Sequence, residues 1–218
     1  MKKPRICAVI VRNEIEAVKR VEPLVDLFEV RIDLIGSGWT ELVKRLPKPW
    51  MACNRCAEEG GNWAESEVQR REELLRAVEL GADIVDIELV TGNLKEMVSK
   101  IKRKAKCLIS CHDFKGTPPL DRLREIVNKE IAAGADISKV VTTAQKFEDN
   151  LTVLQLIADF PKSRIVSFAM GGLGTISRIL CPLLGGEFSY ATMKEGNQSA
   201  AGQITVADLS KIYRMLKK

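Results

Sequence analysis

The sequence predicts a single-domain (β/α)8 barrel over residues 1–218. Eight short, β-branched apolar runs alternate with longer amphipathic runs, which is the pattern of strands and helices in turn. The repeat averages about 27 residues, close to the β/α unit of such barrels, and no linker or low-complexity segment interrupts it. With 45% apolar residues, the chain has enough material for one large core. An open, doubly wound parallel sheet is the alternative.

The predicted strands are apolar along most of their length, because strands of such a barrel are buried on both faces. In chain order they are residues 5–11, 27–33, 49–55, 82–89, 106–111, 136–142, 164–170 and 187–192. The carboxyl ends of all eight meet at one mouth, where barrel enzymes carry their chemistry. Polar residues late in a strand are therefore candidate site residues.

The helices are predicted from the 3.6-residue period and from their start and stop signals. The clearest patterns are residues 63–81, 119–135, 151–160 and 205–218. Gly81 ends the first of these, and Pro119 and Gly134 flank the second. The tetrapeptide GADI begins at both glycines, each time where a helix gives way to a strand, which supports a repeated unit.

Charge and composition argue against a nucleic-acid partner. The net charge is only +5, and basic and acidic residues are interleaved. The densest basic patch, IKRKAK at 101–106, follows a helical pattern, where cations suit the negative end of the helix dipole. A solvated helix end is favoured there over a nucleic-acid patch. Aromatic residues make up 5% of the chain, which leaves few rings for base stacking.

No membrane segment is expected. The apolar run at 7–11 is too short for a signal peptide or a membrane span, and Arg12 follows it directly. No other stretch approaches the roughly 20 apolar residues that a span requires. We therefore expect a cytoplasmic protein, with its six cysteines as reduced thiols.

Lys139 lies inside the predicted strand 136–142, where a charged side chain is costly. If it points into the barrel with Ile137 and Val141, desolvation favours the neutral amine, which is a nucleophile. The alternative is an edge lysine that extends to water. A closed barrel has no edge strands, so a functional lysine is favoured.

Glu29, Arg31 and Asp33 alternate along the second predicted strand. Period two places all three on one face. This arrangement fits a pre-organised polar site and fits a structural salt-bridge ladder equally well.

His112 is the only histidine of the chain and closes the fifth predicted strand. An imidazole has a suitable pKa for general acid–base catalysis without further adjustment. A structural histidine paired with Asp113 is the equal alternative.

Three loops after strands carry further candidates. NRCAEEGGNW follows the third strand, where a carboxylate could lie over the barrel mouth, although an ordinary acidic loop has the same composition. GGLGTISR could bind an anion through backbone amides, and its Arg178 could pair with a substrate carboxylate. EGNQSAAGQ has the composition of a mobile lid, in which Ser199 and Gln203 could donate neutral hydrogen bonds.

These features occur together and in order in one family. The chain resembles type I 3-dehydroquinate dehydratase, the lysine-dependent hydro-lyase of the shikimate pathway. The stretches that carry the resemblance lie between residues 28 and 209 and are FEVRID, NRCAEEGG, DIVDIEL, SCHDFKGTP, ADISKV, MGGLGTISR and SAAGQITVADL. None would suffice singly, whereas their combination and spacing are specific.

The resemblance implies a role for nine residues. Lys139 matches the lysine that forms a Schiff base with the substrate ketone, His112 the general acid–base, and Glu59 the acid that orients the histidine. The residues that match substrate contacts are Glu29, Arg31, Arg55, Arg178, Ser199 and Gln203. The family is built as a (β/α)8 barrel, is usually a homodimer, and uses no metal or organic cofactor. Its substrate is 3-dehydroquinate.

The chain departs from the family at a few positions. Ala201 stands in the lid where proline is common, and Cys56 replaces a residue that is often serine. The first strand offers no polar contact to transfer. Because the chain starts near its first strand and ends after its eighth helix, we expect neither an N-terminal hairpin below the barrel nor a fused second enzyme.

Three other interpretations compete with this one. The first is a zinc site, built from Cys53, Cys56, Cys107, Cys111 and His112. Its weakness is that Cys107 and Cys111 lie about 13 Å apart along one strand. The second is a Schiff-base aldolase, which needs Lys139 but not a His112–Glu59 pair. The third is an inactive binding module, against which the intact Lys139, His112 and Glu59 all argue.

Overall fold

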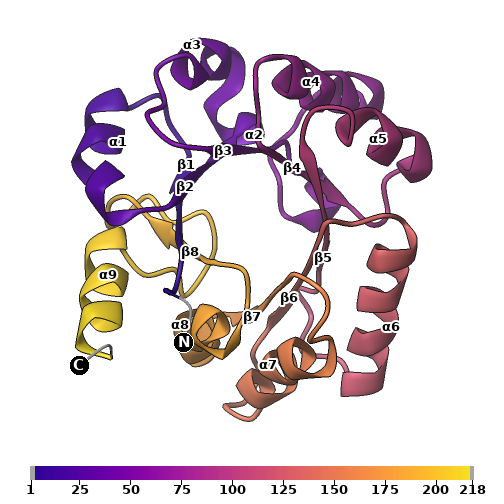
Figure 1. The fold of residues 1–218 in the computed structure, drawn as a ribbon, viewed down its shortest axis with the longest axis vertical. Coiled ribbons are helices and arrows are strands. Elements are labelled where there is room, and N and C mark those ends of the chain that lie inside the picture. Colours follow the sequence, from indigo (N-terminus) through magenta and orange to yellow (C-terminus); the bar gives the residue numbers. More distant parts are fainter. Residues whose placement is uncertain (1–2, 217–218) are drawn as a thin grey trace.

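The computed structural model describes residues 3–216 and shows eight parallel strands with helices around them (Figure 1). The strands are β1 Ile6–Ile10, β2 Leu27–Arg31, β3 Trp50–Cys53, β4 Ile84–Glu88, β5 Lys106–His112, β6 Ile137–Thr143, β7 Ile165–Met170 and β8 Ser189–Thr192. Each overlaps one predicted run, so the eight-fold pattern is confirmed.

The strands form one sheet in the order β7-β6-β5-β4-β3-β2-β1-β8, with parallel neighbours throughout. The barrel is nearly closed. It has one gap, because within residues 3–216 no β-ladder joins β7 to β8. A single backbone bond links the two sides at the bottom of this gap, from the Glu187 amide to the Ile165 carbonyl at 2.7 Å. Higher up, the rings of Phe168 and Tyr190 meet edge to face at 6.0 Å. The predicted barrel is therefore confirmed, with its seam filled by aromatic side chains.

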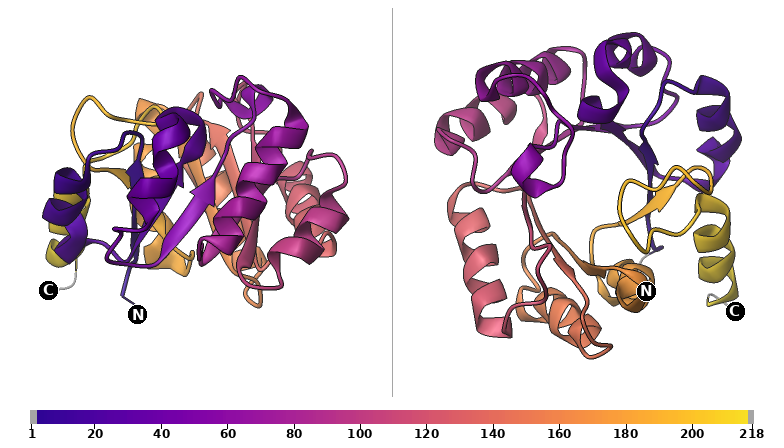
Figure 2. Two further views of the ribbon diagram at one scale, coloured as in Figure 1. Left: turned by 90° about the horizontal axis from the view of Figure 1, so that it is seen from above. Right: turned by 180° about the vertical axis from the view of Figure 1, so that it is seen from behind.

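Helices form a ring outside the strands (Figure 2). They are α1 Ile15–Val21, α2 Ile32–Ile35, α3 Trp39–Val43, α4 Glu67–Glu79, α5 Leu94–Ile101, α6 Leu120–Ala132, α7 Asp149–Asp159, α8 Thr175–Leu180 and α9 Val206–Met215. The four predicted helices are confirmed: α4 and α6 are shorter than predicted, α7 begins two residues earlier, and α9 ends at Met215, with residues 217–218 of its prediction outside the described residues. For example, α4 starts only after Ser66, whose side chain and that of Gln69 form a capping box.

The side chains of each strand alternate between two apolar layers. Outward residues such as Ile10 and Ile109 pack with the helices, whereas inward residues such as Met51, Leu108 and Ile137 fill the lower barrel. Because the lower interior is a packed apolar core, the charged residues of the barrel interior gather near its upper mouth. In Figure 2 the loop that follows β8 projects at one end of the barrel, opposite the two termini.

The second strand differs from its prediction. It ends at Arg31, and Asp33 lies in the short helix α2 rather than on the face of the strand. Asp33 still approaches Arg31, because the chain turns directly after the strand. None of the helices described between residues 3 and 216 is long and apolar enough to cross a membrane.

Candidate active site

A cavity of about 280 Å³ opens at the carboxyl ends of the strands. All nine residues singled out from the sequence line it, namely Glu29, Arg31, Arg55, Glu59, His112, Lys139, Arg178, Ser199 and Gln203. They come from six strands or the segments that follow them, so the barrel topology is what brings them together.

Lys139 points from β6 into this cavity and is only 5% exposed. Its Nζ lies 2.8 Å from Asp86 Oδ2 and 4.5 Å from the centre of the Tyr190 ring. Val141, two residues on, lines the same cavity, as period two requires. The lysine is therefore an interior residue, and the alternative of an edge lysine that extends to water is wrong.

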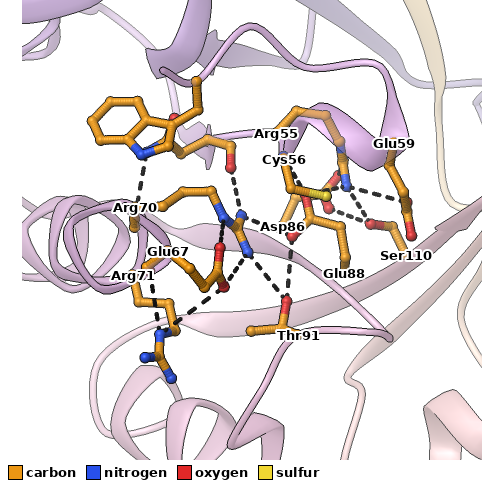
Figure 3. Close-up of polar contacts among 12 residues, drawn as sticks. Arg55, Cys56, Glu59, Glu67, Arg70, Arg71, Asp86, Glu88, Thr91 and Ser110 are labelled. Carbon is orange, nitrogen blue, oxygen red and sulfur yellow. Dashed lines mark hydrogen bonds and ion pairs between the residues drawn. The ribbon is translucent and has the colours of Figure 1, made fainter. Parts of the chain in front are cut away.

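Asp86 is a central residue that sequence reasoning did not assign. It lies in β4, is fully buried and accepts a hydrogen bond from Lys139. It also accepts from Ser110 Oγ at 2.6 Å and forms an ion pair with Arg55 Nη2 at 2.7 Å (Figure 3). Burial opposes its ionisation, but the charges of Arg55 and Lys139 outweigh burial and hold the pKa of Asp86 well below its usual range. An aspartate in the middle of an apolar strand was the available signal.

His112 and Glu59 form a second polar pair in the cavity. His112 Nδ1 lies 2.6 Å from Glu59 Oε2, and the imidazole stacks on Phe114 with centroids 6.4 Å apart. Burial and the charges of Arg55 and Lys139 lower the pKa of His112 well below its usual value. The ring is thus neutral near pH 7. When Nδ1 donates to the carboxylate, Nε2 is the free acceptor of a proton.

The turn that carries Glu59 depends on two glycines. Gly60 has a φ of +77°, and a Cβ there would lie 2.6 Å from the Phe114 ring. A Cβ on Gly61 would lie 1.9 Å from the Arg55 carbonyl oxygen. The turn can therefore fold closely over β3 and bring Glu59 onto His112. Burial raises the pKa of Glu59 to about 7, against the opposing charge of Arg55.

Asp113 is not the partner of His112, so the alternative of a structural His112–Asp113 pair is wrong. Its Oδ1 accepts hydrogen bonds from the backbone amides of Lys115 (2.8 Å) and Gly116 (3.2 Å). The carboxylate therefore stabilises the turn after β5. The carboxylate beside His112 is that of Glu59, the residue that the resemblance implies.

Glu29 and Arg31 line the wall formed by β2. The Arg31 guanidinium is held by Asp33 through two bonds, Nε to Oδ1 at 2.9 Å and Nη2 to Oδ2 at 2.7 Å. Burial raises the pKa of Glu29. Both earlier interpretations thus hold in part, since Arg31 and Asp33 form a structural ion pair while Glu29 and Arg31 face the cavity.

Arg178 projects from α8 and is 2% exposed. Its guanidinium lies 4.4 Å above the Phe168 ring, and Nη2 donates to the Ala201 carbonyl at 3.2 Å. Among residues 3–216 nothing accepts from its Nε, and burial lowers its pKa to about 10. A buried cation without an anion is costly, so this group is suited to bind a carboxylate that enters the cavity.

The loop after β8 forms the part of the cavity wall next to Arg178. Gln203 Oε1 accepts from the Ser199 amide (2.9 Å) and hydroxyl (3.3 Å), which closes the loop on itself. The Gly171 amide donates to the Ala201 carbonyl at 3.2 Å and ties the loop to β7. The predicted lid residues therefore lie together beside Arg178.

The zinc interpretation is not supported by the positions of its cysteines. Cys107 packs between sheet and helices, whereas Cys53 lines the cavity inside the barrel. Within the described chain, the one group of three potential metal ligands is Glu29, Cys53 and Asp86. This group shares only Cys53 with the predicted zinc cluster. Its Asp86 is already bound by Lys139 and Arg55.

The cavity combines a buried amine, a neutral imidazole oriented by a carboxylate, and a buried arginine. An amine can form an imine with a ketone, and a neighbouring imidazole can then move a proton at the adjacent carbon. The arrangement is suited to the conversion of a small anionic keto compound.

Comparison with known proteins points in the same direction. A family model described as Type I 3-dehydroquinase matches residues 6–218. A 3-dehydroquinate dehydratase of Dehalococcoides mccartyi is 44% identical over 215 residues, covering 98% of this chain and 96% of that protein. One of Methanocaldococcus jannaschii is 35% identical, covering 97% and 98%. The crystal structure of 3-dehydroquinate dehydratase from Geobacillus kaustophilus superimposes with a TM-score of 0.88 at 26% identity, over 99% of this chain and 92% of that one.

Proposed function

The chain belongs to the type I 3-dehydroquinase family, and from this premise we propose that it dehydrates 3-dehydroquinate to 3-dehydroshikimate through a Schiff base on Lys139. The observation that carries the mechanism is the position of Lys139, buried in the cavity with Asp86 on one side and the His112–Glu59 pair also on the cavity wall. Such a hydro-lyase belongs to the shikimate pathway of aromatic biosynthesis.

The substrate carboxylate binds Arg178. This guanidinium is buried, lies beside the loop after β8, and has an Nε free for an incoming acceptor among the described residues. The hydroxyl groups of the substrate contact Glu29, Arg31 and Arg55 on the opposite wall. Ser199 and Gln203 close over the substrate from the loop, which makes the reaction site less accessible to water.

The first chemical step joins Lys139 to the ketone. Lys139 releases a proton and attacks the carbonyl carbon as the neutral amine. That proton returns to the departing hydroxyl, so water leaves and a protonated imine remains. This cation lies where the ammonium of Lys139 lies now, so Asp86 is its counter-ion at the same contact of 2.8 Å. The iminium makes the proton on the neighbouring carbon acidic, because it can accept the electrons that the proton leaves behind.

His112 moves both protons of the elimination. Its Nε2 takes the proton next to the imine, which gives an enamine and an imidazolium that Glu59 stabilises. The enamine then expels the β-hydroxyl group, and the same imidazolium protonates it, so that water leaves. Hydrolysis of the remaining imine releases the product and restores Lys139. One histidine is sufficient, which accounts for a chain with a single imidazole.

Turnover of purified protein tests the substrate assignment. We expect 3-dehydroquinate to be converted to the conjugated enone 3-dehydroshikimate, at the same rate with and without a strong chelator. No turnover of 3-dehydroquinate would remove the substrate assignment. A rate that chelator abolishes and zinc restores would favour a metal-dependent reaction instead.

We further propose that the protein acts in the cytoplasm as a homodimer, without metal, organic cofactor or nucleic-acid partner. The support is the family resemblance, together with the modest net charge and a site that is complete within one chain. Sedimentation equilibrium checks the dimer, since a mass of one 24.2 kDa chain would contradict it.

A further inference from the structure

A buried carboxylate outside the cavity contacts the reaction machinery from behind. Glu88 ends β4, is fully buried, and is absent from the residues that line the cavity. It therefore cannot touch a substrate. Its carboxylate nevertheless contacts Arg55, which lines the cavity, and Cys56, which begins the turn that holds Glu59 (Figure 3).

One oxygen of Glu88 holds two different parts of the site. Oε1 accepts from Arg55 Nη1 at 2.9 Å and from the backbone amide of Cys56 at 3.1 Å. The first contact fixes a guanidinium that faces the cavity. The second fixes the peptide at which the chain leaves β3 for the turn that carries Glu59.

The Cys56 residue is the base of that turn. Its carbonyl oxygen accepts from the amides of Glu59 (3.2 Å) and Gly61 (2.9 Å). Because the amide of Cys56 is held by Glu88 and its carbonyl is held by the turn, the position of Glu59 depends on this one residue. The close approach of Gly61 to the Arg55 carbonyl leaves little room for the turn to shift.

The other oxygen of Glu88 faces a second buried arginine. Oε2 lies 2.8 Å from Arg70 Nη1 and 3.4 Å from Thr91 Oγ1. Arg70 also donates to the Asn54 carbonyl at 2.6 Å and binds Glu67 at the protein surface. The carboxylate therefore lies between two guanidinium groups, Arg55 and Arg70, which balance its charge away from water.

We propose that Glu88 is a positioning residue for the dehydration, which holds the Cys56 amide so that Glu59 stays in register with His112. The proposal rests on the function proposed above. Arg70 completes the arrangement, since it fixes Glu88 from the side remote from the substrate. Arg55 has a second anchor in Asp86 at 2.7 Å, so it depends less on Glu88 than Glu59 does.

Glu88→Gln tests the proposal. The substitution keeps the shape but replaces one acceptor oxygen by an NH₂ group that must face a guanidinium or the Cys56 amide. We expect kcat to fall at least about tenfold, a part of the roughly 10²- to 10⁴-fold that a general acid–base contributes. KM should change less than about threefold because Arg55 keeps Asp86. Borohydride should still trap substrate on Lys139, since imine formation does not require the His112–Glu59 pair.

Glu67→Gln is the matched control, because Glu67 is the other carboxylate on Arg70 and its side chain is 45% exposed. We expect its kcat to stay within about twofold of wild type. Glu88→Asp keeps the buried charge but is one methylene shorter, so it should fold and still lower kcat.

A lower melting temperature with unchanged kcat in folded Glu88→Gln would mean that Glu88 only stabilises the fold, and would overturn the proposal. If the glutamine variant does not fold, wild-type kcat in Glu88→Asp would overturn it as well. Failure of the proposed function is a separate result, because it appears in the wild-type protein as an absence of trapping at Lys139.

Discussion

Lys139 and Asp86 form a buried ion pair across two strands, with Nζ 2.8 Å from Oδ2 inside the barrel. They lie on β6 and β4, and Ser110 of the intervening strand β5 pairs with Lys139 in the register and donates to Asp86. The pair places the proposed nucleophile beside a carboxylate that is ionised. An iminium formed on Lys139 would therefore have its counter-ion in place before the reaction starts.

Asp86→Asn should lower kcat by about 10²- to 10³-fold, the range for loss of one pre-organised electrostatic contact. The amide keeps the shape of the site but cannot balance the iminium. Steady-state kinetics on folded variant protein measures the effect. Ser110→Ala removes one hydrogen bond to Asp86 but leaves its charge, so a smaller loss is expected. A kcat within threefold of wild type in the asparagine variant would rule out the counter-ion role.

His112→Ala should lower turnover by about 10²- to 10⁴-fold, the usual contribution of a general acid–base. Imine formation on Lys139 should persist, because the amine and Asp86 are untouched. Mass spectrometry after borohydride treatment reads the imine, and a coupled assay reads turnover. Near-normal turnover would remove His112 from the acid–base role.

The acid limb of kcat/KM should lie near pH 7. Burial raises the pKa of Glu59 to about 7, so as pH falls through that value a proton enters the Glu59–His112 pair and Nε2 is no longer held as a free acceptor. Activity is therefore present above about pH 7 and lost below it. In Glu59→Gln the limb should move to lower pH, because the pKa of His112 itself is lowered. An unchanged limb in that variant would contradict the assignment.

Glu59 also makes the stability of the fold depend on pH. Its contribution to stability falls as pH rises, whereas activity increases. Its folded-state pKa lies above the unfolded value, so between about pH 4.5 and 7 the folded state takes up a proton that the unfolded state does not. The Glu59 contribution to the free energy of unfolding therefore decreases as pH rises through this window. Denaturant titrations of wild type and Glu59→Gln at pH 5 and 8 measure the difference, which should vanish if Glu59 has an ordinary pKa.

Arg178→Lys should raise KM at least about tenfold with a smaller change in kcat, since lysine keeps the charge but cannot form the two parallel bonds of a guanidinium. Arg124→Lys is the matched control, because Arg124 is a surface residue paired with Asp159. Its kinetics should equal those of wild type. An Arg178→Lys variant with wild-type KM would show that the substrate carboxylate binds elsewhere.

The fold could be predicted from the sequence because each strand is a separate short apolar run between recognisable helices. The capping glycines and the alternation of strand and helix fixed the number and order of elements. The gap between β7 and β8 could not be predicted. The side chains that fill it, Phe168 and Tyr190, look like ordinary core residues in the sequence.

The residues of the site could be predicted from the sequence, but most of the contacts between them could not. Lys139 stood out because a charge in a buried strand requires a reason, and its position in the cavity agrees with that expectation. The Glu59 partner of His112 came from the family resemblance, and the two side chains are in contact. Reasoning from the residues alone offered Asp113, which is adjacent in sequence, because Glu59 lies 53 positions away. Asp86 was missed because its neighbours Arg55 and Lys139 come from other strands. Pairings across strands depend on register, which a single sequence does not reveal.

The covalent intermediate is the most direct test of the mechanism. Protein incubated with 3-dehydroquinate and sodium borohydride, then digested and mapped by mass spectrometry, should carry one reduced adduct on Lys139 and lose activity in proportion. Lys139→Ala should carry none and be inactive. Active wild-type protein in which Lys139 remains unmodified under these conditions would contradict the Schiff-base mechanism.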